Sequence, residues 1–471
     1  MTNANGKKPS TCIIGAGPAG LAAGLELAVH NFPVTVFEKS EKMGGIARTE
    51  EYHGSRFDIG GHRFYTKVEE IQALWEHVLG EKFLKVSRLS RIYYQGKFFH
   101  YPINAWQVVA KLGIVESIKI FSSYLWAKTF PSKEEENFEQ WVSNRFGHRL
   151  YEMFFKTYTE KVWGLPCNQI RAEWAAQRIM DLSFGSAIRN AILGDTSVKS
   201  LVDEFYYPSR GPGMMWEAFS DRIKENGGTV LSNSDVTLLR HNGKQIASIG
   251  VRSEKAIQQL SPDHVISSMP IDELIDKLDP QPPPKVVQAA DLLKYRAFIL
   301  VGIVVKGILF RDNWVYIHSP NFKVGRIQNF RNWSPEMVSD PEVTSIGMEY
   351  FCSEGDELWT TPDFQLIQLA TEELIELGLL ADQEIVDSVV FRQKKAYPVY
   401  DGDYRRNLDV IQAYLAAFEN LQTIGRNGMF RYNNQDHSML TGLLAARNIM
   451  GETHDLWEVN TERSYHESIA K

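Results

Sequence analysis

The chain opens with an apolar run that passes through a glycine-rich stretch into a helical pattern. Residues 11–14 (TCII) form a short, largely apolar run, and residues 15–20 read GAGPAG. Behind the glycines, Leu21 and Leu25 recur with alanines between them, which is the spacing of an apolar helix face. Residues 33–37 (PVTVF) then alternate in polarity, as a strand does. This order predicts a strand, a tight turn, a helix and a second strand.

The pattern changes repeatedly further along the chain. Residues 68–85 have helical spacing, and residues 91–103 (RIYYQGKFFHYPI) predict a hairpin around their central Gln-Gly pair. From about 105 to 200 the apolar positions recur at helical spacing with few strand signals. Residues 295–400 are richer in β-branched and aromatic residues, which favours a sheet. We therefore expect a helical insertion and, after it, a sheet-based region.

Later stretches of the chain show the same α/β pattern as the N-terminus. Residues 206–251 offer a glycine-rich turn, an amphipathic helix and then strands around an Asn-Gly pair. Residues 263–274 indicate a strand that leads into a turn. Within residues 421–451 a strand leads into a Gly-x-x-Gly turn, and a helix follows from about 436. One domain assembled from separate segments is the expected result.

Composition and charge narrow the function classes. The 471 residues suggest two or three domains, and 44% hydrophobic and 23% charged residues are typical of a globular protein. A net charge of -7 offers no broad basic field, so we expect no nucleic-acid partner. The three cysteines lie far apart without paired metal-ligand spacing, which predicts a reducing compartment and no metal site. A short polar start and the lack of a bilayer-length apolar run predict a cytoplasmic protein without a transmembrane segment.

The first strand–turn–helix–strand unit has the features of a dinucleotide-binding site. Gly15 permits the tight turn, Gly17 lets the backbone approach a pyrophosphate, and Gly20 lets the helix pack closely on the strand. The helix N-terminus adds free N–H groups and a positive dipole end. Glu38, at the end of the second strand, can accept from ribose hydroxyls and would repel a 2′-phosphate. The residues themselves leave NAD and FAD open.

The segment behind Glu38 favours FAD. It carries a Gly-Gly pair that ends in Gly45, followed closely by Arg48. This arrangement resembles the extended FAD-binding pattern of amine-oxidase-like and glutathione-reductase-like flavoproteins. In that resemblance the glycines pass near the flavin side of the cofactor, and Arg48 neutralises pyrophosphate or flavin oxygens.

Over most of its length the chain resembles the UDP-galactopyranose mutases, and the eukaryotic type more than the usual bacterial one. The most specific motif is the last, in which Gly-Arg-x-Gly is followed by Tyr-x-x-Asn-Gln-Asp-His-Ser. The stretches that carry the resemblance are FDIGGHRFYT (57–66), GKFFHYPIN (96–104), EKVWGLPCNQIRAEWAAQRI (160–179), FYYPSRG (205–211), YRAFILVGIVV (295–305), GRIQNFRNWSP (325–335) and GRNGMFRYNNQDHSM (425–439).

The resemblance implies an α/β fold with a discontinuous Rossmann-like FAD-binding domain, a helical insertion and a β-sheet substrate domain. The proline cluster at 280–285 is the best linker candidate. The expected limits are 1–85, 205–270 and 405–471 for the three FAD-binding segments (the last with the C-terminal tail), 86–204 for a mainly helical substrate region, and 271–404 for the sheet-based substrate domain.

The resemblance also implies an activity. Such enzymes interconvert the pyranose and furanose forms of a nucleotide sugar, with N5 of reduced FAD as the nucleophile and NADH or NADPH as the external reductant. The partner is then a nucleotide-sugar substrate. The sugar, the nucleotide base and the oligomeric state, including a homo-oligomer, stay open.

Site residues follow from the motifs, position by position. Arginines match phosphate oxygens with a planar, permanently charged fork, and the family's pair falls on Arg178 and Arg326. His62 is implied to lie on the flavin face and to respond to the redox state or to relay a proton. Neutral substrate-binding donors and aromatics fall on Tyr101, Asn104, Trp163, Tyr316, Tyr397 and Tyr432. The remaining cofactor positions are Gly60, Gly61, Val236, Gly425, Arg426, Asn434, Gln435 and Ser438.

Two other classes of protein remain open on the sequence. A flavin oxidase or desaturase, like protoporphyrinogen oxidase or phytoene desaturase, shares the N-terminal pattern. It would need an apolar tunnel or an aromatic cage, and residues 106–130 could form an amphipathic helix that serves a membrane or an apolar ligand. The other class is a non-catalytic flavin-binding protein.

Overall fold

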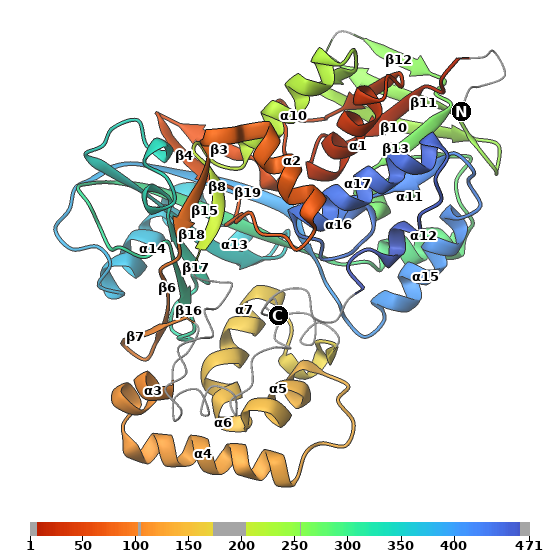
Figure 1. Ribbon diagram of the computed structural model, residues 1–471. Helices are drawn as coiled ribbons and strands as arrows, with labels where there is room; N and C mark the ends of the chain where they lie inside the picture. The colour runs from red at the N-terminus through yellow and green to blue at the C-terminus, as the bar shows by residue number, and fades with distance from the viewer. Residues whose placement is uncertain (1–6, 102–104, 173–203, 255, 462–471) are drawn as a thin grey trace.

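The computed structural model describes residues 7–101, 105–172, 204–254 and 256–461. Figure 1 shows a sheet layered with helices at one end of the molecule, a helical region at the opposite end, and a large sheet to the side of both. Of the predicted site residues, Asn104 and Arg178 lie outside the described residues.

A five-stranded parallel sheet is assembled from segments that are far apart in the chain. Its strand order is β20-β13-β1-β2-β9. Ile13 packs on one face of the sheet, whereas Cys12 and Ile14 pack on the other, as the two-residue period of a strand requires. The strands are β1 (Thr11–Ile14), β2 (Val34–Phe37), β9 (Thr229–Leu231), β13 (His264–Ser267) and β20 (Leu421–Thr423).

Helices cover both faces of this sheet. On the Ile13 face lie α1 (Pro18–Val29), α10 (Gly213–Glu225) and α17 (Gln435–Met450). Gly442 allows α17 to approach α1, because a Cβ there would lie 2.1 Å from the carbonyl oxygen of Ala19. The opposite core contains α11 (Ile271–Asp276), α12 (Pro284–Asp291) and α15 (Tyr404–Leu415), with a small sheet of order β12-β11-β10-β14. Those strands are β10 (Ser234–His241), β11 (Ile246–Ser253), β12 (Ile257–Leu260) and β14 (Leu278–Asp279).

A second large sheet has seven strands in the order β19-β15-β18-β17-β16-β6-β7, and only the β16–β6 pair is parallel. Helix α14 (Asp363–Glu376) packs against one face, and the second face shares a core with the helical region. The strands are β6 (Ser90–Tyr94), β7 (Lys97–His100), β15 (Tyr295–Lys306), β16 (Trp314–Ile317), β17 (Arg326–Asn329), β18 (Val343–Cys352) and β19 (Ile385–Pro398).

The helical region comprises α3 (Ala105–Leu112), α4 (Ile114–Thr129), α5 (Phe138–Phe146), α6 (His148–Tyr151) and α7 (Thr157–Trp163). A capping box between Asn137 and Gln140 fixes the start of α5. The remaining elements that bear on the site or on the connections are β3 (Thr49–Tyr52), β4 (Ser55–Asp58), α2 (Glu69–Leu79), β5 (Phe83–Ser87), β8 (Glu204–Pro208), α13 (Glu357–Thr360) and α16 (Gly425–Gly428).

The α/β class and the predicted hairpin at β6–β7 are confirmed. The helix expected over 68–85 is shorter than predicted, because it ends at Leu79 and residues 83–87 form β5. Gly80 has a φ of 53°, and β5 pairs with β8, which is distant in sequence. Within the described ranges, no helix is both long and apolar enough to cross a membrane. The proposed domain limits stay a prediction.

Candidate functional site

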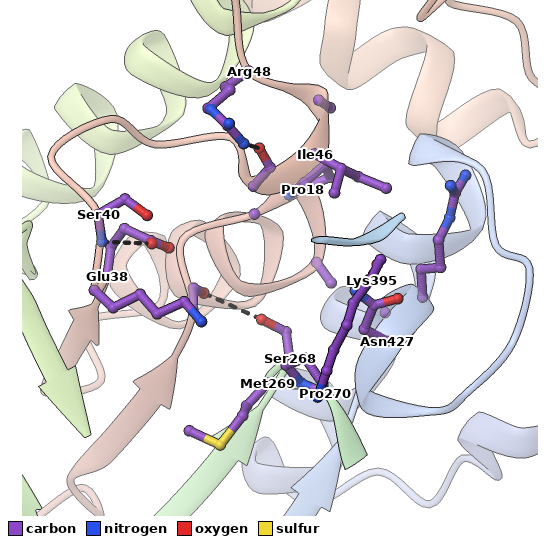
Figure 2. A pocket seen from close by; sticks show the side chains of 18 of the residues that line it. Pro18, Glu38, Ser40, Ile46, Arg48, Ser268, Met269, Pro270, Lys395 and Asn427 are labelled. Atoms are coloured by element: carbon purple, nitrogen blue, oxygen red, sulfur yellow. Dashed lines mark hydrogen bonds between the residues drawn. The ribbon is translucent and has the colours of Figure 1, made fainter. Parts of the chain in front are cut away.

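A cleft of about 590 Å³ lies at the carboxyl ends of the parallel strands, where open α/β sheets bind ligands. Residues that directly follow β1, β2 and β13 line it, among them Gly15, Glu38 and Ser268. Figure 2 shows Glu38 and Ser40 on one side of the cleft and Lys395 and Asn427 on another. Side chains from both large sheets therefore meet at this cleft.

The three fingerprint glycines have different surroundings. Gly15 has a φ of 95°, and a Cβ there would lie 2.3 Å from Oγ of Ser268. A Cβ on Gly20 would lie 2.0 Å from the carbonyl oxygen of Gly15, so this glycine serves the packing of α1 against the turn. Gly17 differs, because the nearest atom to its Cβ would be 3.9 Å away and the residue lines the cleft. Its open side leaves room for a ligand.

Glu38 is held in place by the backbone of the glycine-rich turn. The N–H of Ala16 donates to Oε2 at 2.9 Å, and the N–H of Ser40 donates to Oε1 at 2.9 Å. The carboxylate is buried and lines the cleft. Val236, from β10, lines the same end. Each carboxylate oxygen keeps a lone pair for a hydroxyl donor, as a ribose contact requires.

Arg48 joins the cleft to the large sheet. Its guanidinium donates to the carbonyl of Gly45 at 2.9 Å, to the side chain of Gln393 at 2.8 Å and to Glu50 at 2.6 Å. Arg48 and Gly45 both line the cleft. Because its donors have fixed partners, the position of the cation is set by the fold.

His62 lies in a loop that two glycines shape. Gly60 has a φ of 90°, and a Cβ on Gly61 would lie 2.3 Å from the ring of Trp314. Nδ1–H of His62 donates to the carbonyl of Gly60 at 2.7 Å, which leaves Nε2 as the acceptor of the neutral ring. Burial, and then the charge of Arg426, lower the pKa of His62 to about 3. The imidazole that faces the cleft is therefore neutral at physiological pH.

Arg326 and Glu349 are register partners on β17 and β18. The guanidinium of Arg326 donates to the buried carboxylate of Glu349, and Nη2 also donates to the hydroxyl of Tyr397 at 2.7 Å. Burial acts to lower the pKa of Arg326, but the charge of Glu349 outweighs it and raises that pKa well above its ordinary value. The other carboxylate oxygen accepts from the N–H of Gly61 at 3.1 Å. A fixed cation therefore sits next to the His62 loop.

An aromatic cluster surrounds Arg326. The rings of Tyr397 and Tyr432 stack with centroids 5.6 Å apart, and the ring of Trp163 lies 6.0 Å from that of Tyr432. Tyr316 lies 5.4 Å from Tyr101, measured between ring centroids. Burial raises the pKa of Tyr397 to about 12, so its hydroxyl stays neutral. The cluster offers hydroxyl groups around the cation of Arg326, and its tyrosines add no charge that would compete with it.

The C-terminal motif completes the cleft. Nε of Arg426 donates to the carbonyl of Asn433 at 2.8 Å, and its guanidinium lies 4.6 Å from the centre of the Tyr432 ring. Asn434 is the N-cap residue of α17, and Gln435 and Ser438 lie in its first turn. All three line the cleft together with Gly425. The positive end of the α17 dipole thus lies at the cleft, where it favours an anion.

The predicted cofactor residues come together, with three exceptions. Gly20, Gly60 and Gly61 do not line the cleft and act by shaping its walls. The described substrate residues form the neighbouring aromatic cluster. Sequence reasoning missed Tyr158, whose ring lies 5.6 Å from that of Tyr316, and Glu349. Glu349 could have been found only from the β17–β18 register.

The residues present fit FAD. The cleft holds an open glycine, a buried acid, a fixed arginine and two helix N-termini in a continuous lining. Gly17 carries no side chain, and the backbone N–H of Ala16 holds the carboxylate of Glu38. Within the described part of the chain, no group of three or more histidine, cysteine or acidic residues is placed to hold a metal ion.

Comparisons with known proteins show the family to which the chain belongs. The model of a family described as flavin containing amine oxidoreductase matches residues 18–406. A probable UDP-galactopyranose mutase of Klebsiella pneumoniae is 27% identical over 170 residues, which cover 34% of this chain and 42% of that protein. A 4,4'-diapophytoene desaturase of Methylomonas sp is 34% identical over 285 residues, which cover 54% of this chain and 52% of that protein. The chain thus spans about half or less of the length of these curated relatives.

Among solved structures, a crystal structure of reduced UDP-galactopyranose mutase matches 98% of this chain and 100% of its own chain. The TM-score is 0.84 and the sequence identity is 22%, so the likeness establishes a shared fold. The resemblance to the mutases and to the amine-oxidase superfamily is confirmed by these matches.

Proposed function

Because the chain belongs to the flavin-containing amine oxidoreductase family, we propose that it holds FAD in the cleft and interconverts the pyranose and furanose forms of a nucleotide sugar. The parallel sheet and its helices are then the discontinuous Rossmann-like domain that binds FAD. When bound and reduced, FAD supplies the nucleophilic nitrogen N5 that this isomerisation requires. The chain's own residues bind the leaving group, position the sugar and stabilise charge.

The observation that carries this proposal is Arg326, whose side chain is only 12% exposed and lies within a cluster of tyrosines. An oxidase or desaturase with an apolar substrate has no use for a guanidinium beside the flavin site, whose partial burial costs free energy even with Glu349 as its partner. A nucleoside diphosphate leaves as an anion, and a guanidinium can donate to its oxygens at any working pH. Arg178, the predicted second arginine, lies outside the described residues.

The remaining parts of the cluster suit a sugar and a nucleotide. Tyr397 and Tyr432 offer hydroxyls and stacked faces beside Arg326, and Trp163 adds an indole face. Tyr158 is added to the predicted set, since its ring contacts that of Tyr316. Neutral donors bind sugar hydroxyls without attracting the diphosphate away from the arginine.

Around the flavin, neutral His62 presents the lone pair of Nε2 as a hydrogen-bond acceptor without adding a fixed charge. Arg426 and the N-terminus of α17 provide the positive potential that an anionic reduced flavin needs. NADH or NADPH reduces the flavin by entering the same cleft.

A FAD-dependent oxidase or desaturase is the second candidate. It is favoured by the 34% identity to the desaturase over 285 residues. The single helix expected over residues 106–130 is instead two helices, α3 and α4, which Gly113 separates. Helix α4 packs against α3, α5 and α6, and its residues do not line the FAD cleft. The two candidates differ in the group that they place at Arg326. The mutase binds the diphosphate of its substrate there, whereas an oxidase or desaturase with an apolar substrate places no anion there.

The test uses the purified flavoprotein under anaerobic conditions. After reduction with dithionite it is mixed with UDP-galactopyranose or UDP-galactofuranose, and the products are separated by chromatography. We expect the reduced protein, and not the oxidised one, to interconvert the two sugars. If neither sugar reacts or shifts the flavin spectrum while an amine, porphyrinogen or carotenoid is oxidised, the second candidate replaces the first.

Substitutions test whether Arg326 contacts the diphosphate leaving group. Arg326→Lys keeps the charge but loses the planar fork, so we expect kcat/KM to fall roughly ten- to a hundredfold through weaker diphosphate binding. Arg406→Ala is the matched control, because that arginine is exposed on α15 and pairs only loosely with Asp403 at 3.4 Å. Unchanged kinetics of Arg326→Lys would remove the diphosphate assignment while leaving FAD binding intact.

A further inference from the structure

Lys161 is a motif residue to which the proposed function gives no task. It lies in α7, within the stretch EKVWG, between Tyr158 and Trp163 of the aromatic cluster. Burial lowers the pKa of Lys161 to about 8, so its ammonium is charged at neutral pH. That ammonium donates to three main-chain carbonyls, those of Ile317 at 3.2 Å, Ser319 at 2.8 Å and Val324 at 3.3 Å. Three acceptors are as many as one ammonium can serve.

The three carbonyls belong to the end of the β16–β17 hairpin. Ile317 is the last residue of β16, and the loop that follows it leads to Arg326, the first residue of β17. Tyr316 and Arg326 are register partners in this hairpin. The side chain of Lys161 therefore joins helix α7 to a loop that closes directly beside the proposed diphosphate-binding cation.

Glu373, on α14, holds the same loop from the other face of the seven-stranded sheet. Its buried carboxylate accepts from the main-chain N–H groups of Lys323 and Val324, and from the hydroxyl of Tyr350 at 2.9 Å. Donors converge on this group, as they do on an ionised carboxylate. Because the sheet and Glu373 already fix the loop, the bonds from Lys161 act chiefly on the position of α7.

The position of α7 sets the width of the aromatic cluster. The ring of Tyr158 stacks on that of His318, in the same loop, with centroids 4.8 Å apart, and lies 5.6 Å from the ring of Tyr316. The guanidinium of Arg296 on β15 donates to two carbonyls in the last turn of α7. Lys161 provides a further attachment, one helical turn after Tyr158 and on the same side of the helix. Loss of this attachment would let α7 shift away from β16.

We propose that Lys161 is a positioning residue for the nucleotide-sugar site, which holds α7 at the distance from the β16–β17 hairpin at which both sides of the aromatic cluster contact one substrate. This inference rests on the proposed function, because it takes the cluster as the nucleotide-sugar site. Lys161 does not line the FAD cleft, so its loss should weaken substrate binding and leave FAD bound.

The affinity of the full flavoprotein for UDP tests the proposal. Lys161→Met keeps the length of the side chain but removes the ammonium, so we expect Kd for UDP and KM for UDP-galactopyranose to rise roughly tenfold, with kcat within about threefold of wild type. Lys161→Arg keeps a cationic donor and should recover most of the affinity. Lys156→Met is the matched control, since Lys156 is exposed just before α7 begins. Wild-type affinity in Lys161→Met would overturn the proposal.

A double variant separates positioning from stability. Lys161→Met leaves Glu373 without the cation that faces it, so this variant should melt at a lower temperature than wild type. Lys161→Met combined with Glu373→Gln removes both charges and keeps an acceptor for the loop. We expect the double variant to recover the melting temperature but not the affinity for UDP, because α7 is still untethered. Recovery of both together would show that Lys161 serves stability alone, and the proposal would be wrong.

Hydrogen exchange reports the attachment of α7 without any substrate. In Lys161→Met the amides of residues 157–164 should exchange at least roughly tenfold faster than in wild type, because helix docking limits their opening. Unchanged exchange would show that Lys161 does not hold α7. A wild type that binds no UDP would instead refute the proposed function and, with it, the substrate role of Lys161, whereas tight UDP binding by both wild type and Lys161→Met would refute the positioning role alone.

Discussion

Arg326 forms an ion pair with the fully buried carboxylate of Glu349 directly behind the loop that carries His62. The two residues face each other across β17 and β18, and the carboxylate of Glu349 also accepts from the side-chain amide of Gln328 and from the N–H of Gly61. One carboxylate therefore holds the proposed diphosphate-binding cation and the loop next to the flavin site. Displacing it would disturb both.

Glu349→Ala should lower the stability of the protein markedly. Removing one partner of a buried pair leaves an uncompensated charge, which costs about 3–5 kcal/mol. The midpoint of urea unfolding measures the loss. Glu384→Ala is the matched control, because Glu384 and its partner Lys306 are both largely exposed and 3.6 Å apart, so we expect a change within about 0.5 kcal/mol. Equal changes in the urea midpoint for the two variants would show that loss of the Glu349 carboxylate costs no more than loss of an exposed ion pair.

Gly20→Ala should lower the thermal stability of the protein, whereas Gly17→Ala should lower its affinity for FAD. A Cβ on Gly20 would collide with a backbone oxygen at 2.0 Å, so we expect Gly20→Ala to unfold at lower temperature. A Cβ on Gly17 meets no atom nearer than 3.9 Å, so Gly17→Ala should keep the melting temperature of the flavin-free protein. Its FAD affinity should fall at least roughly tenfold, because the methyl group enters the space of the pyrophosphate. Flavin fluorescence titration of the apoprotein measures this, and an unchanged affinity would place the pyrophosphate elsewhere.

The cleft could be predicted from sequence because its determinants are local. Gly15, Gly17 and Glu38 lie in one strand–turn–helix–strand unit, in which spacing alone fixes their positions. Glu349 and Tyr158 could not be predicted in this way, because their partners Arg326 and Tyr316 are brought to them by strand register and helix docking. No local pattern reports such a contact.

The same limit explains β5. Its residues continue the helical spacing of α2, but Gly80 ends that helix and β8 provides a distant pairing partner for residues 83–87. Tertiary pairing overrides the local pattern here. The predicted hairpin at β6–β7 succeeded because its partner strand follows after two residues.

Asp58 should make stability fall as the pH rises. It is fully buried, accepts from Tyr207 at 2.5 Å and from Thr49 at 2.9 Å, and burial raises its pKa to about 7 despite these bonds. The folded state therefore holds a proton that the unfolded chain releases near pH 3.8. This contribution is full below pH 3.8 and is lost as the pH rises through 7. It amounts to up to about 4 kcal/mol.

Asp58→Asn tests this linkage. Asparagine keeps an acceptor for Tyr207 but cannot ionise, so the variant should gain stability relative to wild type as the pH rises from 5 to 8. Urea midpoints at the two pH values give the comparison. A difference between variant and wild type that does not change with pH would mean that Asp58 is already ionised in the folded protein at pH 5.

His62 should make the stability of the folded protein fall as the pH is lowered, which is the opposite of the trend expected for Asp58. Its pKa is lowered to about 3, first by burial and then by Arg426, whereas the unfolded chain titrates near 6.5. Between these values the unfolded state binds the extra proton, so the contribution of neutral His62 is full above pH 6.5 and is lost as the pH falls toward 3. In the flavin-free protein, His62→Gln should therefore gain stability relative to wild type as the pH falls from 7.5 to 4.5, by up to about 3 kcal/mol.

Urea midpoints of the two flavin-free proteins at these pH values measure the effect. Arg426→Gln in the wild-type background provides the check on its cause, because removing that charge should raise the pKa of His62 and reduce the acid-dependent loss. If His62→Gln and wild type lose stability in parallel on acidification, His62 is protonated in the folded protein at pH 4.5. In that case a proton on Nε2, rather than a lone pair, would face the flavin site.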